Sequence, residues 1–326
     1  MKNNEKIKIG GKNKCFIVAE ISANHAGKLS NVLKLISKSK EIGADAVKIQ
    51  TYTPDDITLN CDNKDFQINK KSVWANYGSM WDLYNNAQTP DEWHAKIFKH
   101  ARKIGILIFS SPFSESSVDL LESLNCPIYK LASPEITHIP LIEKIAQTKK
   151  PIIISTGLSV KQDIILAIKK FKKISNAKIF LLKCTTEYPA AYEDVNLKTM
   201  SNMKKIFKTE VGLSDHTLGV EIPLGAIAMG ASIIEKHICI DKKIKTVDNF
   251  FSLDVKEFNY MIKSIRNLEK AIGKINYDIP INIKKNLSGK RSIYFSKDIK
   301  NNDVITKENI KVVRPAYGLH PKFYSK

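Results

Sequence analysis

Two histidines and two lysines occupy positions where an ordinary solvated role is difficult. His216 and His237 each stand at the end of a short apolar run, and a pair of neutral imidazoles suits a divalent metal ion. Lys48 and Lys130 lie inside other apolar runs, and lysines combined with serine hydroxyls suit a phosphate group. Either histidine alone would more often be a hydrogen-bonded core residue, so it is their matching placement on neighbouring runs that favours a metal site.

Other polar side chains fall at the ends of similar runs and complete a ring. Burying such a ring without a ligand would cost free energy, since unpaired buried polar groups are expensive. Besides the four residues above, the ring comprises Glu20, Asn24, His25, Gln50, Ser110, Ser111, Ser133, Glu135, Ser155, Thr156, Thr185, Thr186, Tyr188, Ser214, Asp215 and Glu235. The serines could instead satisfy turns, and Gly27, Gly157 and Gly219 are expected to serve backbone geometry.

Eight apolar runs rich in β-branched residues carry this ring. They span 16–22, 46–52, 107–113, 127–133, 151–157, 179–185, 210–216 and 232–238. Several are continuous rather than alternating, as in parallel strands buried on both faces. Because helical segments separate them, the pattern predicts an α/β protein with a (β/α)8 barrel, in which chemistry sits at the C-terminal strand ends. A doubly wound open sheet is the alternative, but no GxGxxG follows the first run.

The connecting segments carry signals of their own. Three polar residues are candidate helix N-caps, namely Ser30, Asp91 and Ser159. The connection 53–90 is unusually long, and a connection of that length usually has a function or carries short helices. Its aromatic residues are Trp74, Tyr77, Trp81 and Tyr84. After Gly273 the pattern breaks, and we expect a linker and then a small unit that cannot build a deep core by itself.

Composition excludes some classes of function. The net charge is +19, but only four of the 52 cationic residues are arginine, the residue that nucleic-acid recognition favours. No nucleic-acid-binding motif is present, so we expect no nucleic-acid partner, and the positive field would instead attract an anionic substrate. The longest weakly polar run, 223–234, is too short to span a bilayer, and no signal peptide fits the start, which predicts a cytoplasmic protein without a membrane partner. The five widely spaced cysteines are expected to be reduced thiols without a catalytic role.

The run ends resemble the sialic acid synthase family. The resembling segments are 19–25 (AEISANH), 47–51 (VKIQT), 110–113 (SSPF), 129–135 (YKLASPE), 155–157 (STG), 212–217 (GLSDHT) and 235–237 (EKH). Seven motifs in order form a specific signal that covers nearly the whole chain. The tail, from Arg291 to the VRP at 313–315, resembles the start of that family's antifreeze-like (SAF) domain. The resemblance implies a TIM barrel over 1–275, a linker over 276–290 and a truncated SAF cap over 291–326.

Within the family, four segments resemble the pseudaminic acid branch. They are 22–27 (SANHAG), 49–55 (IQTYTPD), 251–254 (FSLD) and 318–324 (GLHPKFY). The sialic and legionaminic acid branches, which typically differ there, stay open as alternatives. Another phosphoenolpyruvate–aldehyde condensing barrel is also an alternative, although a sugar-phosphate substrate would need a second phosphate site and few arginines are spare. A non-catalytic binding protein with a broken cap is the contrasting class.

The resemblance implies a transferase and a mechanism. C3 of phosphoenolpyruvate would attack the aldehyde carbon of an amino sugar, 2,4-diacetamido-2,4,6-trideoxy-altrose in this branch. Water would add at C2, and phosphate would leave with C–O cleavage. His216 and His237 would hold a divalent metal ion, Mn²⁺ or alternatively Mg²⁺ or Co²⁺, that polarises the aldehyde.

The same resemblance implies roles for the other site residues. The phosphate would be held by Lys48, Ser111, Lys130, Ser133, Ser155 and Ser214. The sugar would be oriented by Glu20, Gln50, Tyr188 and Asp248. Glu135 is the candidate for handling the proton of the water. Arg314 would reach the N-acetyl group from the cap of the partner subunit, in a homodimer with swapped caps.

Two departures from the family pattern affect these expectations. Thr186 stands where sialic acid synthases carry an asparagine, so one phosphate contact is expected to be remade or absent. The family's cap normally runs well beyond 318–324, so we expect turnover to be lower than that of a full-length relative.

Overall fold

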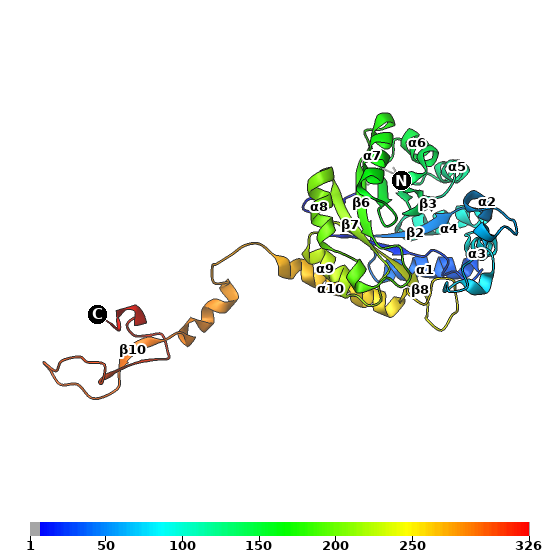
Figure 1. The fold of residues 1–326 in the computed structure, drawn as a ribbon. Coiled ribbons are helices and arrows are strands. Elements are labelled where there is room, and N and C mark those ends of the chain that lie inside the picture. Colours follow the sequence, from blue (N-terminus) through cyan, green and yellow to red (C-terminus); the bar gives the residue numbers. More distant parts are fainter. Residues whose placement is uncertain (1–6, 326) are drawn as a thin grey trace. The chain divides into compact units, whose positions relative to one another are not determined.

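Parallel strands close into a barrel in this computed structural model, which describes residues 7–325 (Figure 1). The strands follow one another in chain order, and the first pairs with the eighth. They are β1 (Phe16–Glu20), β2 (Ala46–Thr51), β3 (Leu107–Pro112), β4 (Tyr129–Leu131), β5 (Ile152–Ser155), β6 (Ile179–Cys184), β7 (Glu210–Asp215) and β8 (Ile233–Cys239). The predicted (β/α)8 barrel is confirmed, and each strand lies within or close to its predicted run.

The continuous apolar runs have the expected cause. In β5, the successive residues Ile152, Ile153 and Ile154 are all fully buried, so both faces of this strand are covered. One face lies toward the barrel interior and the other toward the outer helices, which is why the strand does not alternate between apolar and polar residues.

Helices follow the strands and pack on the outside of the barrel (Figure 1). The main ones are α1 (Leu29–Glu41), α4 (Asp91–Ile104), α5 (Glu115–Ser123), α6 (Ile139–Gln147), α7 (Lys161–Ile174), α8 (Lys198–Phe207), α9 (Glu221–Ala228) and α10 (Val255–Ile272). In α4 the buried residues His94, Ile97, Phe98 and Ala101 recur at helical spacing, so one face of the helix covers the barrel.

The three predicted N-caps are wrong. The N-cap positions of α1, α4 and α7 are occupied by Lys28, Pro90 and Val160. The hydroxyl of Ser159 donates to Thr156 O, and the backbone N–H of Val160 donates to Asp163 Oδ2 instead. Asp91 is the first residue of α4, where a carboxylate interacts favourably with the positive end of the helix dipole.

The long connection after β2 carries short helices, as predicted. They are α2 (Pro54–Ile57), η1 (Lys64–Phe66), η2 (Ala75–Tyr77) and α3 (Met80–Ala87). The indole of Trp74 donates a 3.0 Å hydrogen bond to Val247 O, which joins this connection to the segment that follows β8. Two distant stretches of the chain therefore meet at the C-terminal side of the barrel strands.

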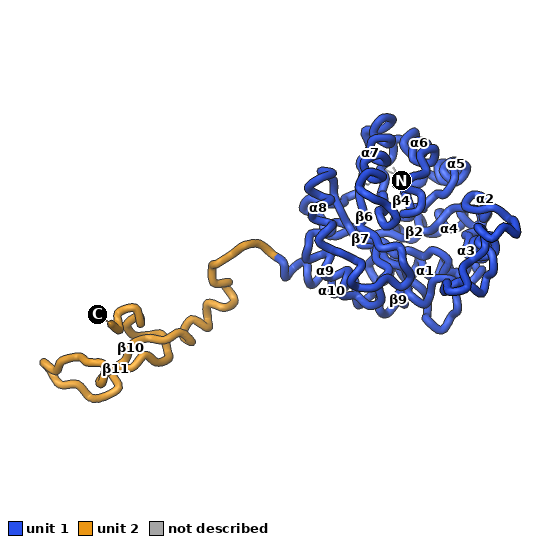
Figure 2. The backbone as a smooth tube through the Cα atoms, in the orientation of Figure 1, with its two compact units in different colours: residues 1–272 blue, residues 273–326 orange. Residues whose placement is uncertain are grey.

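The chain divides into two compact units, residues up to 272 and residues from 273 onward (Figure 2). The second unit holds η5 (Ile281–Gly289), β10 (Ser292–Phe295), β11 (Ile310–Val313) and η6 (Pro321–Phe323). β10 and β11 pair antiparallel, with Ser292 opposite Val313, and η5 occupies the second half of the segment predicted to be a linker.

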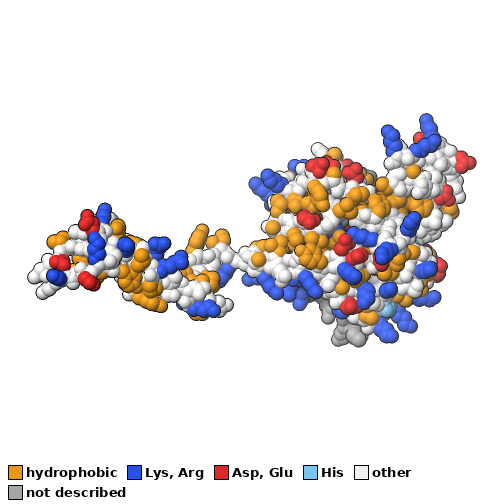
Figure 3. Space-filling model, turned by 90° about the horizontal axis from the view of Figure 1, so that it is seen from below, with side chains coloured by type: hydrophobic (Ala, Val, Ile, Leu, Met, Phe, Trp, Pro, Cys, Tyr) orange, Lys and Arg blue, Asp and Glu red, His pale blue; other side chains and the backbone are white. Residues whose placement is uncertain are grey.

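On the face that Figure 3 draws, the positive charge is scattered. Figure 3 shows Lys and Arg side chains distributed over the visible face among acidic and apolar ones. The described residues on this face therefore form no continuous basic stripe of the kind that nucleic-acid binding uses. Within residues 7–325, no helix combines the length and the apolar character that crossing a bilayer requires.

Candidate active site

Charged side chains from non-neighbouring strands meet inside the barrel. The Lys48 ammonium on β2 lies 3.3 Å from Glu20 Oε2 on β1 and 3.2 Å from Glu235 Oε1 on β8. The Lys130 ammonium on β4 lies 3.7 Å from the same Glu235 oxygen. All four side chains are almost completely buried. Strands β2, β4 and β8 can meet only across the interior, so these residues define the inward face of their strands.

Burial and charge set the protonation of this cluster. Burial raises the pKa of Glu20 to about 7, against the opposing effect of Lys48. Burial would also raise the pKa of Glu235, but Lys130 and Lys48 together hold it below its usual value. Burial lowers the pKa of Lys130, whereas Glu20 and Glu235 outweigh the effect of burial on Lys48 and raise its pKa. The cluster thus has one firmly ionised lysine, one firmly ionised carboxylate and one carboxyl that binds a proton near neutral pH, and an incoming anion would favour the charged form of Lys130.

Serine hydroxyls surround the two lysines. The Lys48 ammonium donates to Ser111 Oγ at 3.3 Å, and the hydroxyl of Ser214 donates to Glu235 Oε1 at 3.0 Å. Ser133 Oγ accepts the backbone N–H of Gly157 at 3.0 Å. The buried hydroxyl of Ser155 has no hydrogen-bond partner among the described residues. Buried polar atoms are usually hydrogen-bonded, so this hydroxyl is available to bind a ligand.

Gly157 keeps this serine region open. A Cβ at position 157 would lie 2.9 Å from Ser133 Oγ and 3.1 Å from Cys184 Sγ, and it would overlap Thr186 Oγ1. Gly157 is therefore required for space, whereas Gly27 and Gly219 have φ values of 64° and 73° and are required for the turn itself.

His216 and His237 face each other at the end of β7 and β8, with ring centroids 5.3 Å apart. Nδ1 of His216 bonds to Thr185 O at 2.8 Å, which leaves its Nε2 for a ligand. Nδ1 of His237 has no hydrogen-bond partner among residues 7–325 and lies 3.7 Å from Asp248 Oδ2. Burial holds the pKa of His237 well below its usual value, which keeps this ring neutral, the state that metal binding requires. Burial lowers the pKa of His216, but the nearby Cys184 outweighs it and raises the pKa above its usual value, so metal binding at His216 would displace a proton.

This donor set fits a divalent metal ion only in part. Among residues 7–325 there is no group of three or more His, Cys, Asp or Glu side chains arranged around a common metal position. The two imidazoles and the nearby Asp248 carboxylate are the available donors, and oxygen atoms of substrate or water would complete the coordination.

The remaining predicted residues lie around the histidines and the cluster. Gln50 Nε2 donates to Glu20 Oε1 at 3.1 Å. The ring of Tyr188 lies 4.4 Å from that of His216, measured between centroids, and Asp248 Oδ2 accepts the backbone N–H of Ala23. Burial raises the pKa of Glu135 to about 7, and its Oε2 has no hydrogen-bond partner in the part of the chain that the structure describes.

Several other residues of the predicted ring form hydrogen bonds with neighbouring strands and loops. Ser110 bonds to Thr51 Oγ1 at 2.6 Å and to Ile49 O at 3.0 Å. The Asn24 amide donates to Ile238 O, and Nε2 of His25 bonds to Ala87 O.

Arg314 follows β11 in the second unit. Its role stays a prediction.

Three residues near the histidines were given no role in the site from the sequence. Trp74 lies with its ring 5.5 Å from Tyr188, Phe251 lies 4.8 Å from His237, and Cys184 Sγ lies 3.9 Å from His216 Nδ1. The aromatic content of the connection 53–90 was the available signal for Trp74. Within the described chain all five cysteines are free thiols, as predicted.

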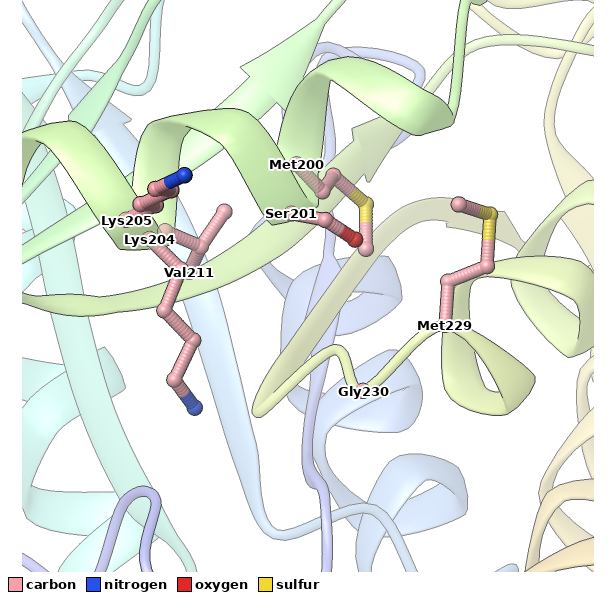
Figure 4. Close-up of a pocket in the computed structure, with 7 residues that line it drawn as sticks. All are labelled: Met200, Ser201, Lys204, Lys205, Val211, Met229 and Gly230. Atoms are coloured by element: carbon pink, nitrogen blue, oxygen red, sulfur yellow. The ribbon is translucent and has the colours of Figure 1, made fainter.

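A separate cavity of about 390 Å³ lies away from this site (Figure 4). It is lined by Met200, Ser201, Lys204, Lys205, Val211, Met229 and Gly230. Val211 is near the N-terminal end of β7, the end opposite the one that leads to His216. The cavity has no histidine or carboxylate in its lining, so it does not compete with the cluster as a reaction centre.

A (β/α)8 barrel with a buried lysine–glutamate cluster and a histidine pair, followed by a small β unit, defines the class of protein. The model of the NeuB family matches residues 35–277, and that of the SAF domain matches residues 290–326. The chain belongs to the NeuB family.

Known proteins resemble the chain along most of its length. Pseudaminic acid synthase of Campylobacter jejuni is 47% identical over 95% of this chain and 90% of its own length. The enzyme of the same name from Helicobacter pylori is 45% identical over 94% of this chain and 90% of its own length. The crystal structure of N-acetylneuraminic acid synthetase from Leptospira borgpetersenii has a TM-score of 0.75, with 29% identity, and the match covers 87% of this chain and 93% of that one.

Proposed function

We propose that the chain is a transferase that condenses phosphoenolpyruvate with 2,4-diacetamido-2,4,6-trideoxy-altrose and water, giving pseudaminic acid and phosphate. Relatives named as pseudaminic acid synthases support this reaction at 45–47% identity. The main structural support for the proposal is that two buried lysines and a histidine pair lie at one end of the same barrel. The reaction needs a phosphate site beside an aldehyde site. A legionaminic acid synthase is 36% identical to the chain, so the precursor of legionaminic acid is the alternative sugar substrate.

The lysine cluster supports binding of the phosphate. Lys48 and Lys130 are already inside the barrel, so an incoming phosphate would replace carboxylate contacts with charge-assisted hydrogen bonds of its own. The proposed phosphate ligands are Lys48, Ser111, Lys130, Ser133, Ser155 and Ser214. The proton that Glu20 binds near neutral pH reduces the repulsion between this carboxyl and the substrate.

The reaction forms a carbon–carbon bond and a carbon–oxygen bond from water, and it breaks the carbon–oxygen bond to phosphate. C3 of phosphoenolpyruvate attacks the aldehyde carbon, and the aldehyde oxygen gains a proton. Water adds at C2 and loses one proton. The C2–O bond to phosphate then breaks, the C2 hydroxyl becomes the carbonyl of the product, and its proton leaves with phosphate. Glu135 is placed to take the proton from water, since its pKa of about 7 makes both protonation states accessible.

The histidine end of the site supports binding of the sugar. Glu20, Gln50, Tyr188 and Asp248 are proposed to orient its hydroxyl and acetamido groups. His216 and His237 are proposed to hold a divalent metal ion, Mn²⁺ or alternatively Mg²⁺ or Co²⁺, which when bound would polarise the aldehyde as a Lewis acid. The aromatic rings of Tyr188 and Phe251 pack against the imidazoles of His216 and His237.

The second unit is proposed to act as a cap. The SAF match over residues 290–326 supports a division into a catalytic barrel over 1–275, a linker over 276–290 and an SAF domain over 291–326. In this proposal two chains form a homodimer, and Arg314 of each chain binds the substrate's N-acetyl group in the site of the other. The reaction would take place in the cytoplasm, where phosphoenolpyruvate is made.

Release of phosphate from phosphoenolpyruvate tests the proposal. The trideoxy sugar and N-acetylmannosamine would be offered separately with Mn²⁺, and a parallel sample would contain EDTA. Release with the trideoxy sugar alone, abolished by EDTA, supports the reaction and the metal. Release with N-acetylmannosamine alone would move the protein to the sialic branch. Release with neither sugar, despite phosphoenolpyruvate binding, would favour an inactive binding protein.

A further inference from the structure

A buried ion pair lies directly beside the two histidines and is not used by the proposed chemistry. The Lys236 ammonium donates to Asp215 Oδ2, and each side chain is only 1% exposed. The two residues are register partners across β7 and β8. Asp215 immediately precedes His216 in the chain, and Lys236 immediately precedes His237. The pair therefore joins the two strands at the point where each presents its histidine.

The ion pair and the histidines point to opposite faces of the strands. Ser214 and Glu235 bond to each other at 3.0 Å inside the barrel, beside Lys48. Successive side chains of a strand alternate between its two faces, so Asp215 and Lys236 point outward, under the helix layer. The next residue of each strand points inward again, which brings the two imidazole rings together inside the barrel mouth.

The same side chains also hold the turn after His216. The Lys236 ammonium donates a second hydrogen bond, of 2.6 Å, to Thr217 O. Asp215 Oδ1 accepts the backbone N–H of Thr217 at 3.1 Å and its hydroxyl at 2.9 Å. His216 is thus fixed through the residue on either side of it, and both of those residues are tied to the strand that carries His237.

We propose that Asp215, Thr217 and Lys236 form a positioning clamp that fixes the separation of His216 and His237 for a divalent metal ion. The inference rests on the proposed metal role of the two histidines. Because this chain offers only two imidazoles and few other donors, their spacing determines how well a metal is held. The clamp acts through the backbone, since Nδ1 of His216 already bonds to Thr185 O.

Mn²⁺ binding to the full chain, measured by titration calorimetry without substrates, tests the clamp. Lys236→Met should weaken Mn²⁺ binding by roughly 10–100-fold, the range found when outer partners of metal-binding histidines are removed. Phosphoenolpyruvate affinity should change far less, because Lys48 and Lys130 come from other strands and Ser214 points to the face of β7 opposite to the ion pair. Phe171→Leu, in the buried face of α7, serves as a control that loses thermal stability but keeps Mn²⁺ affinity.

A double variant separates positioning from simple stabilisation. Lys236→Met leaves the Asp215 carboxylate buried without its cation and could unfold the chain, whereas Asp215→Asn combined with Lys236→Met removes both charges. A double variant that melts like the wild type but still binds Mn²⁺ weakly supports the clamp. Recovery of wild-type Mn²⁺ affinity in the double variant would overturn it. A wild-type chain that binds no Mn²⁺ would overturn the metal role and the clamp together, while phosphate release with the trideoxy sugar would still be tested separately.

Discussion

The Lys48 ammonium lies 3.2 Å from Glu235 Oε1, although β1 separates the strands that carry these two residues. The contact crosses the barrel interior and brings a cation and an anion together where water is excluded. Lys48 also contacts Glu20, whereas Lys130 pairs with one carboxylate of the described residues, Glu235, at the longer distance of 3.7 Å and donates to Leu131 O. The two lysines are therefore unequal in what they stabilise, even though both are proposed to bind the same phosphate.

This inequality predicts different effects on stability. Lys48→Met should lower the free energy of unfolding by about 3–5 kcal/mol, because Glu20 and Glu235 would both lose their nearest cation inside the protein. Lys130→Met should cost clearly less, since Glu235 keeps Lys48. Urea denaturation of both variants measures the difference. Both variants should also bind phosphoenolpyruvate more weakly. Equal losses of stability would contradict the arrangement described here.

The sequence predicts this fold well because its signals are local and repeated. The continuous apolar run at 151–157 became β5, and a run of that kind needs no knowledge of its neighbours. Helix starts were harder, because the competing hydrogen bond from Ser159 to Thr156 O depends on the exact path of the turn. Cap positions therefore could not be placed from residue type alone.

The sequence predicted which polar residues lie near the strand ends, but not which face of its strand each side chain occupies. A shift of one residue along a strand moves a side chain to the opposite face, and strand ends are uncertain by more than that. Ser110 and Asp215 were accordingly placed in the ring of site residues, yet both bond to scaffold groups. Trp74 could not be assigned a partner, because its contact with Val247 O joins segments far apart in the chain.

Glu135 should make stability depend on pH. Burial raises its pKa from 4.5 to about 7, so the folded state favours the protonated carboxyl. The folded chain then binds more protons than the unfolded chain between these values, and stability falls as pH rises from about 4.5 to 7 and levels off above. Glu135→Gln removes this loss and should be more stable than the wild type at pH 8, by on the order of 3 kcal/mol at most.

The same titration should be visible in catalysis. If Glu135 takes a proton from water, it must be ionised, so kcat should rise through pH 7 in the wild type. Glu135→Gln should reduce kcat and remove this rise. Thermal melts and initial rates across pH 5–9 provide both readouts. A variant with the wild-type pH–rate profile would exclude Glu135 from the proton transfer.

Gly157→Ala should disturb the proposed phosphate site by steric overlap alone. The added methyl group would meet Ser133 Oγ at 2.9 Å and press on Thr186 Oγ1, so the serine side must shift. We expect a higher KM for phosphoenolpyruvate and an overpacking cost of about 1–3 kcal/mol. Gly289→Ala is a matched control, because nothing lies within 4 Å of a Cβ there. Unchanged KM in Gly157→Ala would show that the serines do not bind the phosphate.

Trp74 should affect the sugar rather than phosphoenolpyruvate. Its ring lies 5.5 Å from Tyr188 and 6.2 Å from Phe250, and its indole bonds to Val247 O, so it closes the aromatic side of the barrel mouth. Tyr188 in turn packs on His216, where the aldehyde is proposed to bind. Trp74→Ala should therefore raise the KM for the sugar and leave the KM for phosphoenolpyruvate unchanged, because the lysine cluster lies on other strands.

The size of this effect and its controls follow from the contacts. Loss of one aromatic contact is worth about 0.5–1.5 kcal/mol beyond area burial, which corresponds to roughly a two- to tenfold rise in KM. Trp74→Phe keeps the ring contact but loses the hydrogen bond to Val247 O, so it should lie between the wild type and Trp74→Ala. Trp81→Phe, in α3, loses only an exposed bond to Asp55 and should leave both KM values unchanged. Equal rises in the two KM values of Trp74→Ala would contradict this prediction. A residue that contacts only the sugar should not weaken phosphoenolpyruvate binding, so equal rises would indicate a general loosening of the barrel mouth.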